Sequence, residues 1–443
     1  MAVSMFSPPR VDRSADAWET RSLRSLLTPR SERDRPDLPL LTVARERGVF
    51  VRSDEDANHN AIPDDLGNYK VARSGDLVIN KMKAWQGSLG LAPVDGIVSP
   101  AYFVFEADFE VPRFGEYLLR SKPYVAKFGA ASDGVRIGQW DLDISRMRNI
   151  EVSLPRADEQ AAIAKYLAHA NARIEKAISA KRRLLVLLEE QKLAIMREEV
   201  DRSGGARLPL KRVMESTTAG VWGLSPEDSK DLPRWCVRVA DFDYGLGRVS
   251  EWPKTMRSIT DKDFRRKKLR PGDLLLEASG GGDKTPVGRV VIFDWQGDAV
   301  CSNFLQRLRP VTGVISEYLA LILRDMHATG AVRLHIKQTT GIQNLDLDSY
   351  FTTPVPIPEM RIQREVLGRV QARSSKSDRA SAQAFREIAL LEEFRTRLVA
   401  DVVTGQVDVR AIAASLPETS ELDTDLDSLL DDDLVDVLGE GEE

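Results

Sequence analysis

The chain has 443 residues, of which 42% are hydrophobic and 30% charged. This is the composition of a soluble globular protein, and the length exceeds that of one ordinary domain of roughly 100 to 200 residues. The sequence has no apolar run close to the ~20 residues that cross a bilayer and no signal-peptide core at its start. Cys236 and Cys301 form no metal-ligand or redox spacing. We therefore expect a cytoplasmic protein of two or three domains with buried, reduced thiols.

Charge is distributed unevenly along the chain. The formal net charge is −5, but the segment after Arg410 has twelve acidic residues and no Lys or Arg, which leaves about +7 on residues 1–410. A mildly basic body suits a polyanionic partner. The acidic tail, 411–443, has the composition of a disordered segment, although its leucine spacing also permits an amphipathic helix that docks on a partner or screens a basic surface.

The first 154 residues contain short strand-like segments bounded by glycine, proline and aspartate. The strand-like segments are 74–79, 90–92 and 99–105, followed by a helical segment at 116–118, a polar loop at 132–136 and a last strand at 140–143. These signals predict a β-rich domain over residues 1–154.

A long helix is predicted next, over 155–203. From Asp158 to about Val200 the chain has neither proline nor glycine. Eight of ten positions at alternating spacings of four and three are apolar or alanine, which is the pattern of a coiled-coil seam. The ten positions are Ile163, Leu167, Ala170, Ile174, Ala177, Lys181, Leu184, Leu188, Gln191 and Ile195.

The same series of signals then repeats about 200 residues later, which predicts a second β-rich domain over 204–357 and a second helix over 358–410. The repeated segments are 271–276, 287–292, 301–305, 317–319 and 345–348. The second helix has a weaker seam, which runs from Val366 through Val370 to Leu398. Because neither helix has enough apolar surface to form a core alone, we expect the two to pair. The predicted fold is α+β, with two β-rich domains alternating with two long helices that pair as an antiparallel coiled coil.

Four motifs, in this order, resemble the specificity subunit of type I restriction-modification systems. They are 80–87 followed by 95–102, Leu154-Pro155 with Glu159-Gln160, 183–192, and 402–409. The sequence departs from the family pattern at Ile362-Gln363, where an acidic residue precedes the glutamine in the family, at Glu198-Glu199-Val200, and in the acidic tail.

The resemblance implies a non-catalytic subunit with two target-recognition domains, each of which reads one half of a bipartite DNA site. The helices would act as conserved spacers that set the gap between the halves. The implied partners are double-stranded DNA, two methylation subunits that transfer methyl from S-adenosylmethionine to adenine N6, and, where present, ATP- and Mg-dependent restriction subunits with nuclease activity. The chain itself would bind no cofactor.

Candidate DNA contacts in the first domain lie in loops between strands. Lys81 and Lys83 could bind phosphate, Trp85 offers a planar ring, and Gln86 offers an amide that can pair with adenine. The alternative is that Trp85 packs under the sheet and the lysines only solvate its edge.

Two polar loops occupy matching places in the two domains, and their placement on a scaffold favours a shared DNA-facing role. Their candidate contacts are Ser132 and Arg136 in the first copy and Lys337, Gln338 and Thr339 in the second.

A glycine run at 280–282 brings Ser279, Lys284 and Thr285 into the candidate set, because glycine lets backbone amides approach phosphate. A flexible hairpin without a ligand explains this run equally well. Asp283 stands where a phosphate-binding loop requires glycine, so we do not expect nucleotide binding there.

No methyltransferase, nuclease or metal-ligand motif is present in the sequence, and the four histidines are scattered. A coiled-coil scaffold is the alternative function, since long heptad helices alone would permit it. Two elaborate β-rich domains of different sequence argue against a scaffold.

Overall fold

The computed structural model describes residues 18–45, 47–53, 65–136, 139–250, 255–282, 285–339 and 342–417. The side chains of Val135, Arg136, Gln139, Gln338 and Thr339 are not among those described. The chain divides into two compact units, which are described separately. Unit 1 comprises Met1–Ser179 and Glu387–Leu430, and unit 2 comprises Ala180–Arg386 and Asp431–Glu443.

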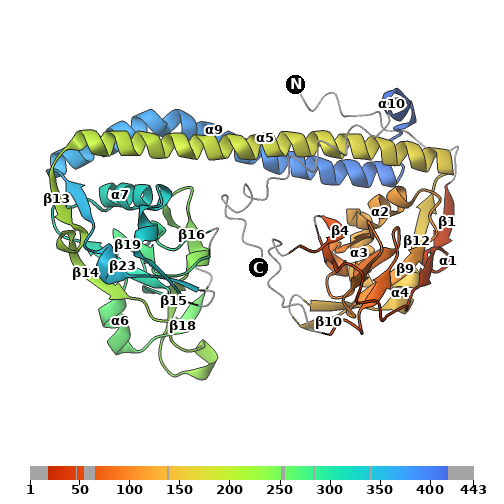
Figure 1. Cartoon of the computed structure of the whole chain (residues 1–443), viewed down its shortest axis with the longest axis horizontal. Helices are drawn as coiled ribbons and strands as arrows, with labels where there is room; N and C mark the ends of the chain where they lie inside the picture. Colours follow the sequence, from red (N-terminus) through yellow and green to blue (C-terminus); the bar gives the residue numbers. More distant parts are fainter. Residues whose placement is uncertain are drawn as a thin grey trace. The chain divides into compact units, whose positions relative to one another are not determined.

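Unit 1 is built around a four-stranded sheet of order β2-β9-β6-β7 (Figure 1). Its elements are β1 (Glu19–Ser22), α1 (Leu23–Leu26), β2 (Leu27–Pro29), β3 (Leu41–Ala44), β4 (Gly48–Val51), β5 (Lys70–Ala72), β6 (Leu77–Asn80), the 3-10 helix η2 (Ala84–Gln86), β7 (Leu89–Leu91), β8 (Gly96–Val98), β9 (Tyr102–Ala107), α2 (Pro112–Arg120), α3 (Lys122–Ala130), β10 (Ser132–Arg136), β11 (Gln139–Leu142), α4 (Ile144–Arg148) and β12 (Glu151–Leu154). Both faces of β6 are covered, since Leu77, Val78 and Ile79 are all fully buried.

Unit 2 repeats this plan with a larger sheet of order β14-β23-β19-β21-β17-β16. Its elements are β13 (Ala206–Pro209), η3 (Leu210–Val213), β14 (Met214–Ala219), η4 (Pro226–Asp228), β15 (Pro233–Val237), η5 (Val239–Asp241), β16 (Phe242–Asp243), β17 (Arg248–Val249), β18 (Met256–Ser258), α6 (Asp261–Lys267), β19 (Asp273–Glu277), β20 (Ser279–Gly280), β21 (Val290–Phe293), β22 (Ala299–Cys301), β23 (Leu305–Pro310), α7 (Ser316–Ala328), η6 (Ala331–His335), β24 (Ile336–Thr339), β25 (Ile342–Leu345), α8 (Leu347–Tyr350) and β26 (Pro354–Ile357). Successive residues of β19 face opposite sides, as strand geometry requires. Leu274 and Leu276 join the core with α7, whereas Leu275 joins the core on the other face.

The internal repeat predicted from the sequence is therefore present in the fold. In both units the first and last strands pair antiparallel, β1 with β12 and β13 with β26. The central strands β6 and β19 both follow a turn with a left-handed glycine, Gly75 or Gly272. In each turn a buried aspartate, Asp76 or Asp273, accepts a backbone N–H and pairs with an arginine from elsewhere in the sheet.

The two long helices are α5 (Ala157–Ser203) and α9 (Met360–Val403), and they pack together in opposite directions, which confirms the predicted α+β fold with paired helices. Within unit 1, Arg395 of α9 donates to Glu175 of α5 at 3.0 Å. Within unit 2, Arg369 and Arg373 both donate to the buried Glu199, at 2.6 and 2.7 Å. These two guanidinium groups hold the pKa of Glu199 below its ordinary value.

The seam of α5 differs from the predicted one in its second half. Ile163, Leu167 and Ile174 are buried as expected, but Leu184 is 43% exposed and its neighbour Leu185 is buried instead. An α-helix has 3.6 residues per turn, so a strict 3.5-residue seam drifts around it by about 20° per heptad. The buried stripe of α5 therefore moves to the adjacent residue.

A buried glutamine ties the first turns of each long helix to the unit in which that helix begins. The side-chain N–H of Gln160 donates to Pro155 O at 2.9 Å, and its oxygen accepts from Val111 N, at the start of α2. Gln363 repeats this arrangement with Pro358 O at 2.8 Å and Ile315 N at the start of α7. The glutamine is thus the residue that the fold requires, and Ile362 beside it does not alter the arrangement.

The last described helix, α10 (Arg410–Ser415), lies at the start of the predicted acidic tail, and His169 contacts Pro417 O at 3.0 Å. The expectation of disorder over 411–443 is wrong for its first residues, because 411–415 are helical and Ala413 is buried. Residues 418–443, the rest of the predicted disordered segment, lie outside the described residues.

Candidate nucleic-acid interface

In unit 1 the loop after β6 lies against the hairpin β10–β11, although the two are about 50 residues apart in sequence. Leu142 N donates to Lys81 O at 3.1 Å. The Lys81 ammonium group lies 3.3 Å from the Asp141 carboxylate. We call residues 80–87 together with β10 and β11 the unit 1 hairpin surface.

Two indole rings form the centre of this surface. Trp85 stacks on Trp140, with ring centroids 5.5 Å apart and planes at 27°. Trp85 is half-buried and its indole N–H donates to Met82 O, whereas Trp140 is 39% exposed. Trp85 thus packs partly within the protein, and its stack reaches the solvent through Trp140, while the predicted DNA contact of Trp85 stays a prediction.

The other predicted residues of this domain lie nearby. Lys83 is exposed, and Gln86 is half-buried at the end of η2. The Ser132 hydroxyl donates to Phe128 O at 2.7 Å, which leaves its oxygen as an acceptor. Arg136 ends β10, but its side chain lies outside the described residues.

The sequence reasoning missed four polar or aromatic residues of the unit 1 hairpin surface and its border. They are Asp133, Trp140, Asp141 and Arg146, and Arg146 pairs with Asp133. The sequence signal for a site here was a tryptophan next to an aspartate, Trp140 and Asp141, in a predicted strand. Their position beside Lys81 depends on strand pairing, which the sequence does not show.

In unit 2 the glycine-rich segment pairs directly with the second hairpin. The strand β20 adds to the edge of β25, so that Ser279 lies opposite Asn344 and Gly280 opposite Gln343. The Ser279 hydroxyl donates to the Asn344 side-chain oxygen. Gly282 N donates to Thr285 O at 3.1 Å. We call residues 279–282 and 285–287 together with β24 and β25 the unit 2 hairpin surface.

Lys337 is the exposed cation of this surface, and its ammonium group lies 2.7 Å from Asp346. That pairing lowers the pKa of the Asp346 carboxyl group. Gln338 and Thr339 continue β24, but their side chains lie outside the described residues, as does the whole of Lys284.

The two hairpins correspond in register next to the helices that follow them, up to an irregularity between Gly134 and Arg136 that the unit 2 hairpin does not have. Asp143 and Asp346 cap the short helices α4 and α8, and each follows its hairpin directly. Counted back from these caps, Trp140 corresponds to Gln343, and Asp141 corresponds to Asn344. Asp133 pairs with Asp141 across its hairpin, as Lys337 pairs with Asn344, so Asp133 corresponds to Lys337. Equivalent positions in the two units thus carry different hydrogen-bonding groups.

Among the side chains outside these surfaces, two cysteines and a histidine have pKa values that burial shifts. Cys236 and Cys301 are free and buried, as predicted, and burial raises the pKa of each thiol to about 12. Burial lowers the pKa of His327, which contacts Pro286 O at 2.9 Å. No group of three or more His, Cys, Asp or Glu side chains within the described ranges could hold a metal ion. In the same part of the chain, no helix has the length and apolar character needed to cross a membrane.

The sequence matches no protein-family model and no curated protein. The structure resembles a chain from a study of complex assembly and conformational transition of the type I R-M (restriction-modification) system. This match has a TM-score of 0.55 and 17% sequence identity, over 91% of this chain and 100% of that one. The chain therefore has the fold of a type I restriction-modification subunit.

Two specificity subunits are also among the similar solved structures. The HsdS subunit from Thermoanaerobacter tengcongensis aligns over 92% of this chain and 100% of its own, with a TM-score of 0.37 and 20% identity. The type I S subunit from M. genitalium aligns over 89% and 99%, with a TM-score of 0.34 and 14% identity. At the level of the fold, the first match confirms the predicted resemblance to a subunit of a type I restriction-modification system.

Proposed function

We propose that the chain is the DNA-specificity subunit of a type I restriction-modification complex. It recognises a bipartite site and directs adenine-N6 methyltransferase subunits, and nuclease subunits where present, to that site. One observation carries the proposal. In each of two repeated units, the described residues that the sequence predicts to contact DNA come from separate segments and lie on one hairpin surface, several of them on its strands rather than in loops.

The groups on these surfaces suit DNA readout. Lysines such as Lys81 and Lys337 bind phosphate and fix the position of the protein on the duplex. Asparagine and glutamine pair bidentately with adenine, and aspartate accepts from the cytosine amino group. Trp140 adds a flat apolar surface that can pack on a sugar or a thymine methyl group.

The differences between the units favour an asymmetric target. Where unit 1 has the exposed Trp140 and the half-buried Asp141, unit 2 has the half-buried Asn344 beside Gln343, which is buried. A carboxylate only accepts hydrogen bonds when ionised, whereas an amide both donates and accepts. The two surfaces would therefore select different base edges, one for each half of the site.

The partners follow from the same proposal. The complex would contain two methylation subunits, which use S-adenosylmethionine, and its restriction subunits would use ATP and Mg²⁺. This chain would bind neither nucleotide nor S-adenosylmethionine itself. The fold match to a chain from a study of type I complex assembly supports such an assembly.

Changing Lys81 or Lys337 to alanine should weaken DNA binding by the purified chain. If each lysine contacts one phosphate, the loss should be nearly uniform across sequences, and the slope of log K against log salt should fall by about one. Fluorescence anisotropy on labelled duplexes between low and moderate salt measures both quantities.

Lys211→Ala is the matched control, because Lys211 is an exposed lysine on η3, whose backbone N–H bonds to Phe351 O away from the hairpin. Its affinity and salt slope should equal those of the wild type. If Lys81→Ala and Lys337→Ala behave like this control, neither lysine belongs to the interface.

A further inference from the structure

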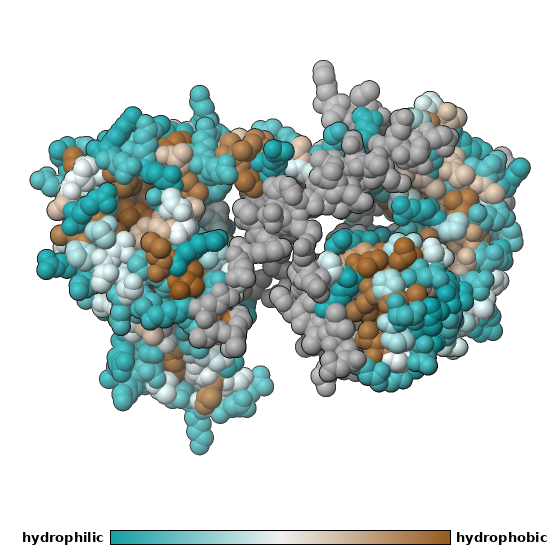
Figure 2. Space-filling model, in the orientation of Figure 1, coloured by the Kyte–Doolittle hydropathy of each residue, from teal (hydrophilic) through white to brown (hydrophobic). Residues whose placement is uncertain are grey.

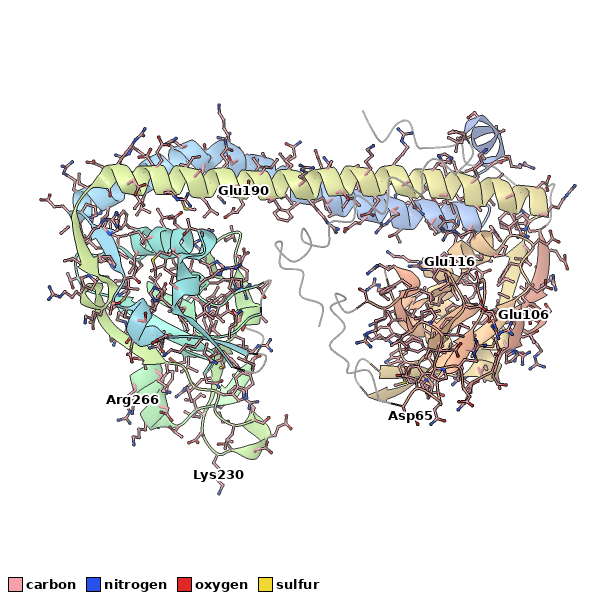
Figure 3. The ribbon with its side chains drawn as sticks, viewed as in Figure 1. Asp65, Glu106, Glu116, Glu190, Lys230 and Arg266 are labelled. Carbon is pink, nitrogen blue, oxygen red and sulfur yellow. The ribbon has the colours of Figure 1, made fainter. Side chains whose placement is uncertain are left out.

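Unit 2 carries a basic segment that the hairpin surfaces do not include. Residues 257–270 contain seven Lys or Arg and two Asp, and α6 forms the middle of this segment. Figure 3 labels Arg266 on α6, and Figure 2 shows a mostly hydrophilic surface over the part of unit 2 where Figure 1 places this helix.

The carboxylates of this segment are already engaged. Asp263 bonds to Thr260, which caps the helix, and Asp261 lies 3.7 Å from Arg234. By contrast, the side chains of Lys262, Arg265 and Arg266 are exposed and make no hydrogen bond or ion pair with any residue that the structure describes. These three cations are available to a ligand.

A buried arginine holds the end of α6 in place. Arg307 is 5% exposed, and its guanidinium group donates to Arg266 O and Lys268 O at 3.1 Å each. It also donates to the Thr218 hydroxyl at 2.8 Å. A cation at the C-terminus of a helix is attracted to the negative end of the helix dipole and stabilises the helix. A helix as short as α6 would not be stable alone. Arg307 therefore keeps the cations of α6 on a fixed helix.

The basic helix is continuous with the unit 2 hairpin surface. Lys267 of α6 donates to Gly220 O at 2.8 Å, and Gly220 N donates to Leu305 O. The adjacent Phe304 O accepts from Ser279 N, which belongs to the hairpin surface. Two exposed aromatic side chains are close in sequence to these bonded residues, Phe304 at 44% and Trp222 at 38%. The Arg257 guanidinium group lies 4.4 Å from the Trp222 ring centroid.

Unit 1 has no such helix at the corresponding place among its described residues. The strand β5 precedes β6 there, and its cations are used within the protein. Lys70 donates to Tyr102 O at 2.5 Å, and Arg73 pairs with Glu32 at 2.6 Å and Asp95 at 2.8 Å. Among the described residues, the basic helix is thus found in unit 2 and not in unit 1.

We propose that α6 is a second DNA-contact site, whose Lys262, Arg265 and Arg266 bind phosphates beyond the half-site read by the unit 2 hairpin. This inference rests on the proposed function and extends it. Exposed Lys and Arg side chains on a rigid helix can bind DNA phosphates. Such contacts position a protein on the duplex without selecting a base sequence. The unit 2 half-site would have the longer protected backbone and the steeper salt dependence.

The test is the full chain with Arg265→Ala and Arg266→Ala together. The Arg266 carbonyl that Arg307 binds is unchanged by this substitution. Each phosphate contact contributes about 0.9 to the salt slope, so the slope should fall by about two. Affinity should fall about equally for all sequences, and hydroxyl-radical protection should shorten at the end of the unit 2 half-site only.

The double variant Lys211→Ala with Arg212→Ala removes the same charge from exposed residues of η3, and it should keep the wild-type slope and footprint. The inference is overturned if the α6 variant matches this control, or if its loss is confined to one DNA sequence. If the wild-type chain binds no DNA, the proposed function itself fails, which is a distinguishable result.

Discussion

Replacing residues 18–154 with the corresponding domain of another specificity subunit should change one half of the recognised sequence and leave the other half unchanged. The first and last strands of this domain pair with each other over four residues, from Glu19 with Leu154 to Ser22 with Glu151. The domain therefore begins and ends at the same place, as an exchangeable domain must.

The attachment of the domain to α5 should survive the exchange. Gln160 bonds to the backbone of Val111 and Pro155, and backbone groups are supplied by any sequence that folds in the same way. Methylation sequencing of a host that carries the hybrid subunit and its partners reads out the new target. The reciprocal exchange of residues 206–357 should change only the other half, and a hybrid that alters both halves would refute independent reading.

Replacing Gln160 or Gln363 with leucine should destabilise the protein by about 2 to 4 kcal/mol at each site, because every lost hydrogen bond leaves a buried backbone group without a partner. Gln363 is fully buried and bonds to Pro358 O, Gly313 O and Ile315 N at 2.8 to 2.9 Å. Gln160 is 2% exposed and makes two such bonds, so its loss should cost less.

Urea unfolding followed by tryptophan fluorescence measures this effect, since both units contain tryptophan. Gln371→Leu is the control, because Gln371 is exposed on the same helix α9 as Gln363, and surface substitutions usually change stability by less than about 0.5 kcal/mol. Unfolding midpoints equal to those of this control would show that the buried glutamines do not hold the helices to their units.

The repeat and the helices could be predicted because their signals are local. Glycine and aspartate before a buried strand, and the absence of proline and glycine over α5, can be read directly from the sequence. The exact positions of the buried seam of α5 could not be predicted, because Leu184 and Leu185 are both apolar. Only the true helical period decides which of the two is buried.

The composition of the hairpin surfaces depends on long-range pairing. Nothing near Lys81 in sequence indicates that it meets Asp141, and nothing near Ser279 indicates Asn344. The support of α6 by Arg307 likewise joins residues 41 positions apart through a strand register that the sequence does not reveal.

The most direct test of the central claim is the adenine-N6 methylation pattern of the host genome with and without this gene. If the chain reads a bipartite site through two different hairpin surfaces, deletion should remove methylation from one motif only. That motif should consist of two unlike half-sites separated by a gap of fixed length without base preference. Expression of the wild-type chain should restore it. A methylome that is unchanged by the deletion, while the methylation subunits are present and active, would contradict the account.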